Sequence, residues 1–152
     1  MNEYTPLVVT GRSTPWHIWV VGLIGVLWNG FGATDFLMTN LNRDMWFEMM
    51  GVTADQAAMM DAMPAWMHGA WFAGTWGAFL GAVAILFRSR WAVYLFWVSI
   101  IGFLISLVHS YILTDTGASM GQQGYIMNGV IFLGAVFFLW YSITMARRGV
   151  LR

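Results

Sequence analysis

The sequence predicts an all-α fold, a polytopic membrane four-helix bundle, and two observations predict it. Of the 152 residues, 59% are hydrophobic and only 9% are charged, whereas soluble domains have about a quarter of their residues charged. Four apolar segments each reach the roughly 20 residues that a helix needs to cross a bilayer, and they are residues 16–38, 64–87, 91–113 and 125–146. Lipid offers backbone groups no hydrogen-bond partners, so each segment is expected to be a helix. By length, residues 1–152 form a single integral membrane domain.

The segments between and before the spans justify these boundaries in order. The first span follows a polar stretch, exceeds the apolar core of a signal peptide and has no clear cleavage site, so we expect a retained helix. Thr53 and Gln56 fit a capping box, which predicts a short outer surface helix over residues 54–63. Pro64 suits the first turn of the second span. The tight turn 88–90 then leads into the third span.

The arginines predict the orientation of the bundle. Arg12, the turn 88–90 and residues 147–152 hold six of the seven basic residues and lie at one set of span ends. The connection between the first two spans has four acidic residues and only Arg43, and the loop after the third span has only Asp115. The positive-inside rule therefore predicts that both termini and the 88–90 turn lie in the cytoplasm.

Small residues at helical spacing predict close packing of the first two spans, because they let helix backbones approach each other in lipid. The residues concerned are Gly22, Gly25, Gly32, Ala70, Gly74, Gly77, Ala78 and Gly81. The pattern leaves open whether these faces pack within one chain, in a homo-oligomer or against a larger membrane complex.

Polar side chains within the spans normally face the bundle interior or a wet cavity. In the predicted orientation the polar side chains that are costliest to bury in lipid, the amides, the carboxylate and the imidazoles, lie in the outer half of the bundle. The polar residues of the inner half carry only hydroxyl groups. This predicts a polar layer that opens outward above a dry inner half. The candidate solute or proton site in this layer consists of Trp28, Asn29, Asp35, His68, His109 and Asn128.

Three interpretations of the layer stay open. In the first, the polar groups only bond neighbouring helices, at about 1 kcal/mol per bond. In the second, a small polar solute binds there, or Asp35 exchanges a proton with His68 or His109, since histidine titrates near neutral pH. In the third, the two histidines hold haem, or join Asp35 around a metal ion. Eight of the twelve methionines lie within residues 38–67, and thioethers favour Cu(I), although a flexible apolar surface helix has the same composition.

The composition also excludes several classes of function. The chain has no cysteine, which excludes disulfides, thiolate metal sites and cysteine catalysis. It has no lysine, which excludes Schiff-base chemistry. A formal net charge of zero without a basic tract argues against a nucleic-acid partner. With no phosphate-binding loop, nucleophile elbow or zincin helix, we predict a protein that is not an enzyme and that holds no cofactor.

One segment carries a resemblance to a known group. Residues 28–39 contain the pattern Trp-Asn-x-x-Gly-x-x-Asp at Trp28, Asn29, Gly32 and Asp35. This pattern, together with residues 64–66, 88–92 and 147–152, resembles a group of small bacterial four-span membrane proteins often labelled sugar transporters. The resemblance covers most of the chain in outline. It implies that the four motif residues act together, and that the protein is a multi-pass protein of a bacterial inner membrane. The chain departs from the group at Phe36, where tyrosine is common, and the histidines and the methionine-rich stretch are not features of the group.

Two function hypotheses of different classes follow. One is a small transporter-like or solute-binding protein that uses the polar layer, and it is expected to need a homo-oligomer because four short spans hardly enclose a transport path. The other is a non-catalytic accessory subunit of a larger membrane complex, for example a respiratory or photosynthetic one. A haem or copper protein using His68 and His109 is the third hypothesis.

Overall fold

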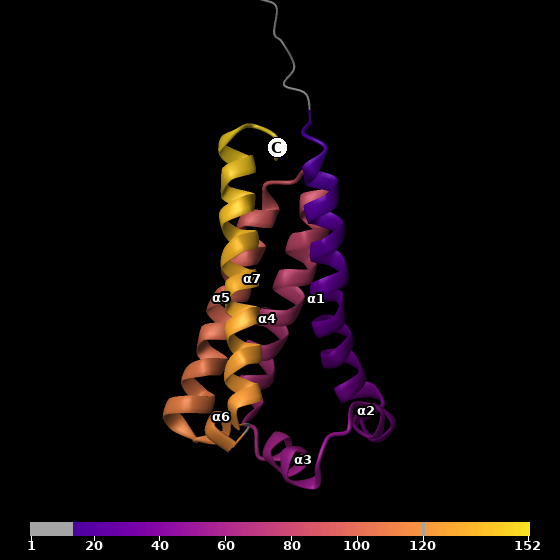
Figure 1. The fold of residues 1–152 in the computed structure, drawn as a ribbon, viewed down its shortest axis with the longest axis vertical. Helices are drawn as coiled ribbons and strands as arrows, with labels where there is room; N and C mark the ends of the chain where they lie inside the picture. The colour runs from indigo at the N-terminus through magenta and orange to yellow at the C-terminus, as the bar shows by residue number, and fades with distance from the viewer. Residues whose placement is uncertain (1–13, 120) are drawn as a thin grey trace, which may run out of the picture.

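The computed structural model describes residues 14–119 and 121–152 (Figure 1), so Arg12 lies outside the described residues. In this part of the chain the elements are all helical, and they are α1 (His17–Leu41), α2 (Arg43–Met50), α3 (Ala54–Asp61), α4 (Ala65–Leu86), α5 (Trp91–Val108), η1 (His109–Leu113), α6 (Thr116–Ser119) and α7 (Gly121–Arg147). Four of them, α1, α4, α7 and α5 extended by the π-helical η1, are long and apolar enough to cross a membrane. The structure thus confirms the predicted all-helical, four-span organisation of a small multi-pass membrane protein.

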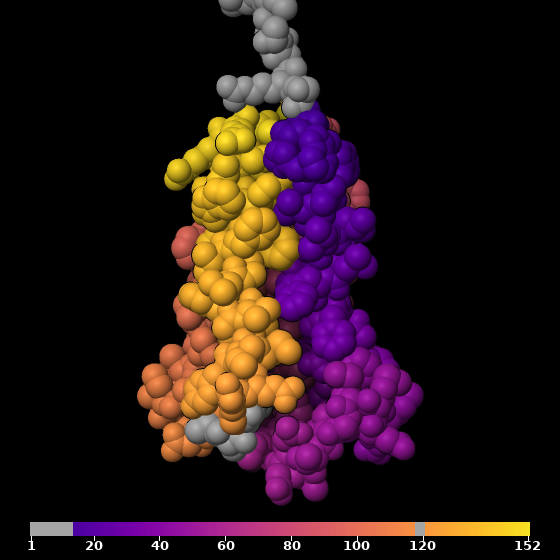
Figure 2. Space-filling view, viewed as in Figure 1, coloured from indigo at the N-terminus to yellow at the C-terminus, as the bar shows by residue number. Residues whose placement is uncertain are grey.

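The bundle has two different ends (Figure 1). We call the end with the start of α1, the 87–90 turn and the C-terminus the terminal end, and the end with α2, α3, η1 and α6 the loop end. Helix α4 packs against both α1 and α5, and α5 packs against α7. Figure 2 shows α1 and α7 close together toward the terminal end, with a hollow between them toward the loop end.

The α4–α5 interface is a close contact between two backbones. A Cβ atom on Gly77 would lie 3.0 Å from a carbonyl oxygen of α5, and one on Gly102 would lie 2.6 Å from the carbonyl oxygen of Ala70. The hydroxyl of Ser99 donates a hydrogen bond to the carbonyl of Gly74 at 2.7 Å. Gly102 was not among the predicted packing residues, because a single glycine in the third span forms no repeating pattern.

The predicted small residues of α1 also face neighbours in the same chain. A Cβ on Gly22 would meet the side chain of Leu86 in α4, and one on Gly25 would lie 2.9 Å from the ring of Phe138 in α7. Gly32 is in looser contact, since its Cβ would lie 3.7 Å from the methyl group of Thr75. The buried small residues of α4 are Ala70, Gly77, Ala78, Gly81, Ala82 and Ala84. These faces are therefore filled from within one chain.

The largest hydrophobic core lies toward the terminal end. Its members come from the first turn of α1, the second half of α4, the first half of α5, the second half of α7 and the tail, and they include Ile18, Ile85, Phe96, Phe138 and Leu151. The rings of Phe96 and Phe138 stack at 5.6 Å between centroids. His17 Nδ1 and the Tyr141 hydroxyl lie 2.6 Å apart and join α1 to α7. The loop half has fewer buried apolar side chains among the described residues.

The last residues of the chain fold back onto the terminal end. Gly149 has a φ of +71°, and Val150 donates its amide to the carbonyl of Met145 at 3.0 Å, which is the Schellman arrangement after a helix. The main chain of the final residue pairs with the 88–90 turn through hydrogen bonds of 2.7 and 3.1 Å. This pairing holds Leu151 in the core, where it is 1% exposed.

The connection between the first two spans holds one helix more than predicted. The capping box is confirmed, since Gln56 donates its amide to Thr53 Oγ1 at 3.3 Å and Thr53 donates its amide to Gln56 Oε1 at 2.9 Å. Helix α3 ends at residue 61 rather than 63. Helix α2 was not predicted because eight residues are too few for a helical period to be decisive, and a tertiary contact described below holds it in place.

Candidate functional site

Asp35, the acidic residue of the motif segment, is bonded to the buried ring of Trp46. Helix α1 places the carboxylate near its own end, and α2 turns back so that Trp46 Nε1 donates to Asp35 Oδ1 at 2.8 Å. Trp46 is 8% exposed, and its ring centroid lies 6.4 Å from that of Phe31. A hydrogen bond to a carboxylate is stronger than one between neutral groups. Asp35 therefore acts as a positioning residue that fixes α2 against α1.

A polar pocket of about 330 Å³ lies beside this contact, where the end of α1, the start of α2, the end of α3 and the start of α4 meet. We call it the loop-end pocket. Its lining residues are Thr39, Asn40, Arg43, Met60, Asp61, Met63, His68 and Trp71. Because α2 supplies Arg43, the Asp35–Trp46 hydrogen bond also positions part of this lining.

Arg43 and Asp61 close one side of the loop-end pocket. The guanidinium forms an ion pair with Asp61, donates to the carbonyl of Ala57 at 3.0 Å and lies 4.7 Å from the centroid of the Phe47 ring. The hydrogen bond that the guanidinium donates to Asp61, together with the negative charge of that carboxylate, raises the pKa of Arg43 above its ordinary value. Arg43 thus stays charged, its charge is balanced by Asp61, and the pair ties α3 to α2.

Two polar groups of the pocket lack a hydrogen-bond partner among the described residues. Oγ1 of Thr39 is buried and unpaired, and the His68 ring makes only an aromatic contact, with Trp71 at 6.5 Å between centroids. Asn40, in contrast, donates to the carbonyl of Phe36 at 2.7 Å. Buried polar groups are normally hydrogen-bonded. The free hydroxyl and imidazole are therefore the groups with which this pocket can bind a ligand.

Comparisons with protein-family models, with curated proteins and with solved structures found no match to this chain. The function is therefore argued from the geometry of the loop end alone.

Trp28 and Asn29, two further motif residues of α1, do not line the loop-end pocket either. Asn29 donates its side-chain amide to the carbonyl of Gly25, in its own helix, at 2.8 Å. Trp28 is 47% exposed, and its indole nitrogen lies 3.8 Å from where a Cβ on Gly134 would be. Trp28 therefore faces α7, near the middle of the bundle.

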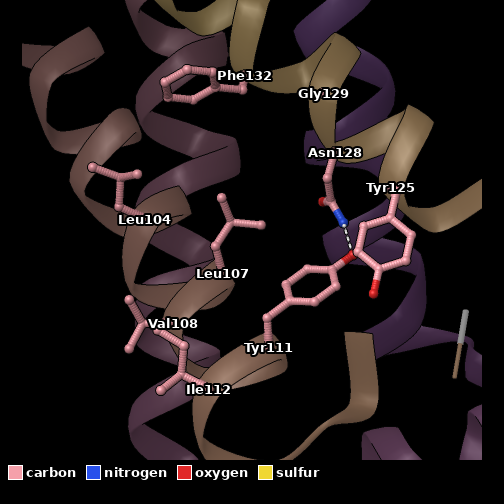
Figure 3. A pocket seen from close by; sticks show the side chains of 9 residues that line it. All are labelled: Leu104, Leu107, Val108, Tyr111, Ile112, Tyr125, Asn128, Gly129 and Phe132. Atoms are coloured by element: carbon pink, nitrogen blue, oxygen red, sulfur yellow. Dashed lines mark hydrogen bonds between the residues drawn. The ribbon is translucent and has the colours of Figure 1, made fainter. Parts of the chain in front are cut away.

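His109 and Asn128 lie apart from the loop-end pocket. His109 begins η1, and its ring packs edge-on against Trp66 at 5.3 Å between centroids. Asn128 donates to the Tyr111 hydroxyl at 3.0 Å, with the Tyr125 ring beside them (Figure 3). Asn128, Tyr111 and Tyr125 line an apolar groove of about 430 Å³ between α5, η1 and α7. The other lining residues are Leu104, Leu107, Val108, Ile112, Gly129 and Phe132. Ile112, at 73% exposed, shows that this groove faces outward from the bundle.

The six predicted site residues are thus distributed over several clusters rather than one. Asp35 bonds Trp46, His68 lines the loop-end pocket, His109 contacts Trp66, and Asn128 bonds Tyr111. Within residues 14–119 and 121–152, no three His, Asp or Glu side chains lie close enough together to hold a metal ion, so Asp35, His68 and His109 do not form such a set.

Most of the pocket lining was absent from the sequence-predicted site. Thr39, Arg43, Met60, Asp61 and Met63 belong to the end of the first span and to the loop that follows it. The methionine enrichment of residues 38–67 was the one signal that pointed to this region. Sequence spacing could not place these side chains around one cavity, because they lie on three different helices and on the connection that follows them.

Proposed function

We propose that this chain is a small solute-binding, transporter-like membrane protein whose site is the loop-end pocket. The observation that supports it is the polar lining, in which a buried Thr39 hydroxyl and a His68 imidazole have no hydrogen-bond partner among the described residues. A buried polar group without a partner costs about 1–3 kcal/mol. Because these two groups line one cavity, a bound solute can supply the hydrogen-bond partners that the described residues do not.

The asymmetry of the bundle supports the same proposal. The terminal half is filled by the core around Phe96 and Phe138, whereas a polar pocket lies at the loop end. We infer that the loop end faces the outside of a bacterial inner membrane, because five arginines lie at the terminal end and only Arg43 at the other among the described residues, as the positive-inside rule requires. A solute then reaches the pocket from outside the cell, and the sealed half prevents leakage through a single chain.

The motif segment fits this proposal, but Asp35 has a different role from the predicted one of binding a solute or exchanging a proton. The resemblance to small four-span proteins labelled sugar transporters supports solute handling. In this proposal Asp35 does not contact the solute; it holds α2, and with it Arg43, against α1. Transport by so few helices would require several copies, and the native mass of the extracted protein measures their number.

A binding screen tests the proposal. The full chain in lipid nanodiscs is heated with a panel of monosaccharides, polyols, amino acids and metal ions, and its unfolding midpoint is recorded. A ligand that binds the folded state raises the midpoint, and the stabilisation grows with the logarithm of the ligand concentration once that concentration exceeds the dissociation constant. We expect at least one probe to stabilise the protein, and Thr39→Val or His68→Ala to abolish that stabilisation.

Thr144→Val is the matched control, because Thr144 lies in the terminal half of α7 and bonds its own helix through the Trp140 carbonyl at 2.8 Å. It should leave the ligand-induced shift unchanged. A screen in which no probe stabilises the protein, or in which all three variants respond like the original chain, would contradict the proposal.

A further inference from the structure

We propose that the loop-end pocket is a site for the soft monovalent cation Cu(I), held by the thioethers of Met60 and Met63 and the imidazole of His68. The inference rests on the proposed function, because it names the class of ligand for the same pocket. It differs from a site that uses both His68 and His109, since His109 does not line this pocket.

The pocket brings together three soft donors from separate parts of the chain. Met60 lies on α3, Met63 in the connection that follows it, and His68 on α4, and all three line one cavity of about 330 Å³. Thioethers and imidazoles are preferred ligands of Cu(I). Methionine has three rotatable side-chain bonds, and His68 has no hydrogen bond to lose among the described residues. The three donors can therefore close onto an ion without breaking a hydrogen bond of the imidazole.

The charges of the pocket favour a soft ion of low charge. Among the described residues Asp61 is the only carboxylate in the lining, and it is paired with Arg43. Hard divalent cations such as Mg²⁺ or Ca²⁺ need several oxygen ligands, and to use Asp61 they would have to break this ion pair. A monovalent ion on sulfur and nitrogen leaves the pair intact and adds only one charge.

The placement of the other methionines supports the inference. Met45, Met49 and Met50 are 41%, 65% and 45% exposed on α2, at the same end of the bundle. Leucine fills apolar space about as well as methionine, so packing alone does not call for eight methionines within residues 38–67. Weak thioether ligands around a pocket increase the local concentration of a soft cation, which explains the enrichment.

Silver provides a direct test, because Ag(I) has the ligand preferences of Cu(I) and does not change oxidation state in air. The full chain in nanodiscs is titrated with Ag(I) in chloride-free buffer by calorimetry, and with Cu(I) in competition with bicinchoninate. We expect one high-affinity ion per chain. Met60→Leu/Met63→Leu should weaken binding at least about tenfold, the loss typical of even an indirect change at a metal site.

Met49→Leu/Met50→Leu is the matched control, since it removes two thioethers that are exposed on α2 and lie outside the pocket. It should change the affinity less than about twofold. Equal losses in both double variants would show binding to the methionine-rich surface in general and would overturn the inference. So would the absence of Ag(I) binding by the original chain, or binding of Zn²⁺ or Mg²⁺ at least as tight as that of Ag(I).

The test separates this inference from the function on which it rests. If Ag(I) does not bind while an organic probe stabilises the original chain but not Thr39→Val, the pocket binds solutes and only the soft-cation class is wrong. If neither kind of probe binds in a way that depends on pocket residues, both proposals fail. Cu(I) that binds with sulfur and nitrogen neighbours in X-ray absorption spectra, and loses the sulfur signal in Met60→Leu/Met63→Leu, supports both.

Discussion

At the residue scale, Trp46 and Trp76 differ in the hydrogen bonding of their indole nitrogen. Trp46 Nε1 donates to Asp35 at 2.8 Å, whereas Trp76 Nε1 is buried without a hydrogen-bond partner among the described residues. The indole ring contributes apolar area in both places. The difference between them therefore isolates what the Asp35–Trp46 hydrogen bond contributes to the stability of the loop end.

We predict that Trp46→Phe lowers the free energy of unfolding by about 1–3 kcal/mol more than Trp76→Phe. The first substitution leaves the Asp35 carboxylate without its donor, and the second removes a donor that has no partner. Thermal unfolding of both variants in nanodiscs, followed by circular dichroism, measures the difference. Equal destabilisation by the two substitutions would show that the hydrogen bond does not hold α2 in place.

The Thr39 hydroxyl makes a second prediction at this scale. Thr39→Val replaces the unpaired hydroxyl with a methyl group of similar shape, so it should leave the ligand-free protein as stable as before or more stable by up to about 1 kcal/mol. Thr75→Val should instead destabilise it, because the Thr75 hydroxyl bonds the Trp71 carbonyl at 3.0 Å. Unfolding midpoints without added ligand compare the two. A clear loss of stability in Thr39→Val would mean that the hydroxyl has a structural role.

At the scale of elements, the bundle depends on how closely α4 approaches α5. The backbones meet where Gly102 faces Ala70 and Gly74, and where Gly77 faces the main chain of Ser99. Without a hydrophobic effect between helices in lipid, close van der Waals contact and interhelical hydrogen bonds hold such pairs together. The Ser99 to Gly74 hydrogen bond is possible only at this separation.

Gly102→Ala should therefore destabilise the bundle by about 1–3 kcal/mol, the usual cost of overpacking. The new Cβ would lie 2.6 Å from the Ala70 carbonyl oxygen, and the backbone there cannot move aside without shifting the whole helix. Gly69→Ala, on α4 with nothing within 4 Å of its new Cβ, controls for the general effect of alanine in a helix. Resistance to denaturation in mixed detergent micelles ranks the variants, and equal behaviour of the two would refute the close contact.

At the scale of the whole molecule, packing and charge divide the bundle along its axis. The core and five of the six described arginines lie toward the terminal end. The polar pocket lies at the loop end, and so do the five described acidic residues outside the spans. The positive-inside rule distinguishes these two ends, because arginine-rich segments tend to stay in the cytoplasm. The direction in which the pocket faces follows from this difference.

The absence of cysteine from the sequence makes the orientation directly measurable. We predict that Ala54→Cys, at the start of α3, reacts with a membrane-impermeant maleimide added to spheroplasts. Ser89→Cys, in the turn between α4 and α5, should react only after the membrane is permeabilised. The reverse labelling pattern would place the loop-end pocket in the cytoplasm, and it would contradict the proposed entry of solute from outside.

Several features of the fold could be predicted from the sequence because their causes are local. The length of each apolar run decides whether it spans a membrane, and all four runs became long helices. The capping box at Thr53 and Gln56 needs only residues three apart. Helix α2 could not be predicted in this way, since the contact that holds it joins Trp46 to Asp35, eleven residues earlier and in another helix.

The sequence by itself determined the number of spans, their helical state and the uneven distribution of arginines, because hydrophobic length and charge act on each segment independently. Only the tertiary structure decided which polar groups meet. In the folded chain Trp46 donates a hydrogen bond to Asp35, and Asn128 donates one to Tyr111. Thr39, Met60 and His68 line one pocket. These contacts depend on how far each helix tilts and rotates, and in lipid that is set by close packing at positions such as Gly102, whose effect extends over the whole bundle.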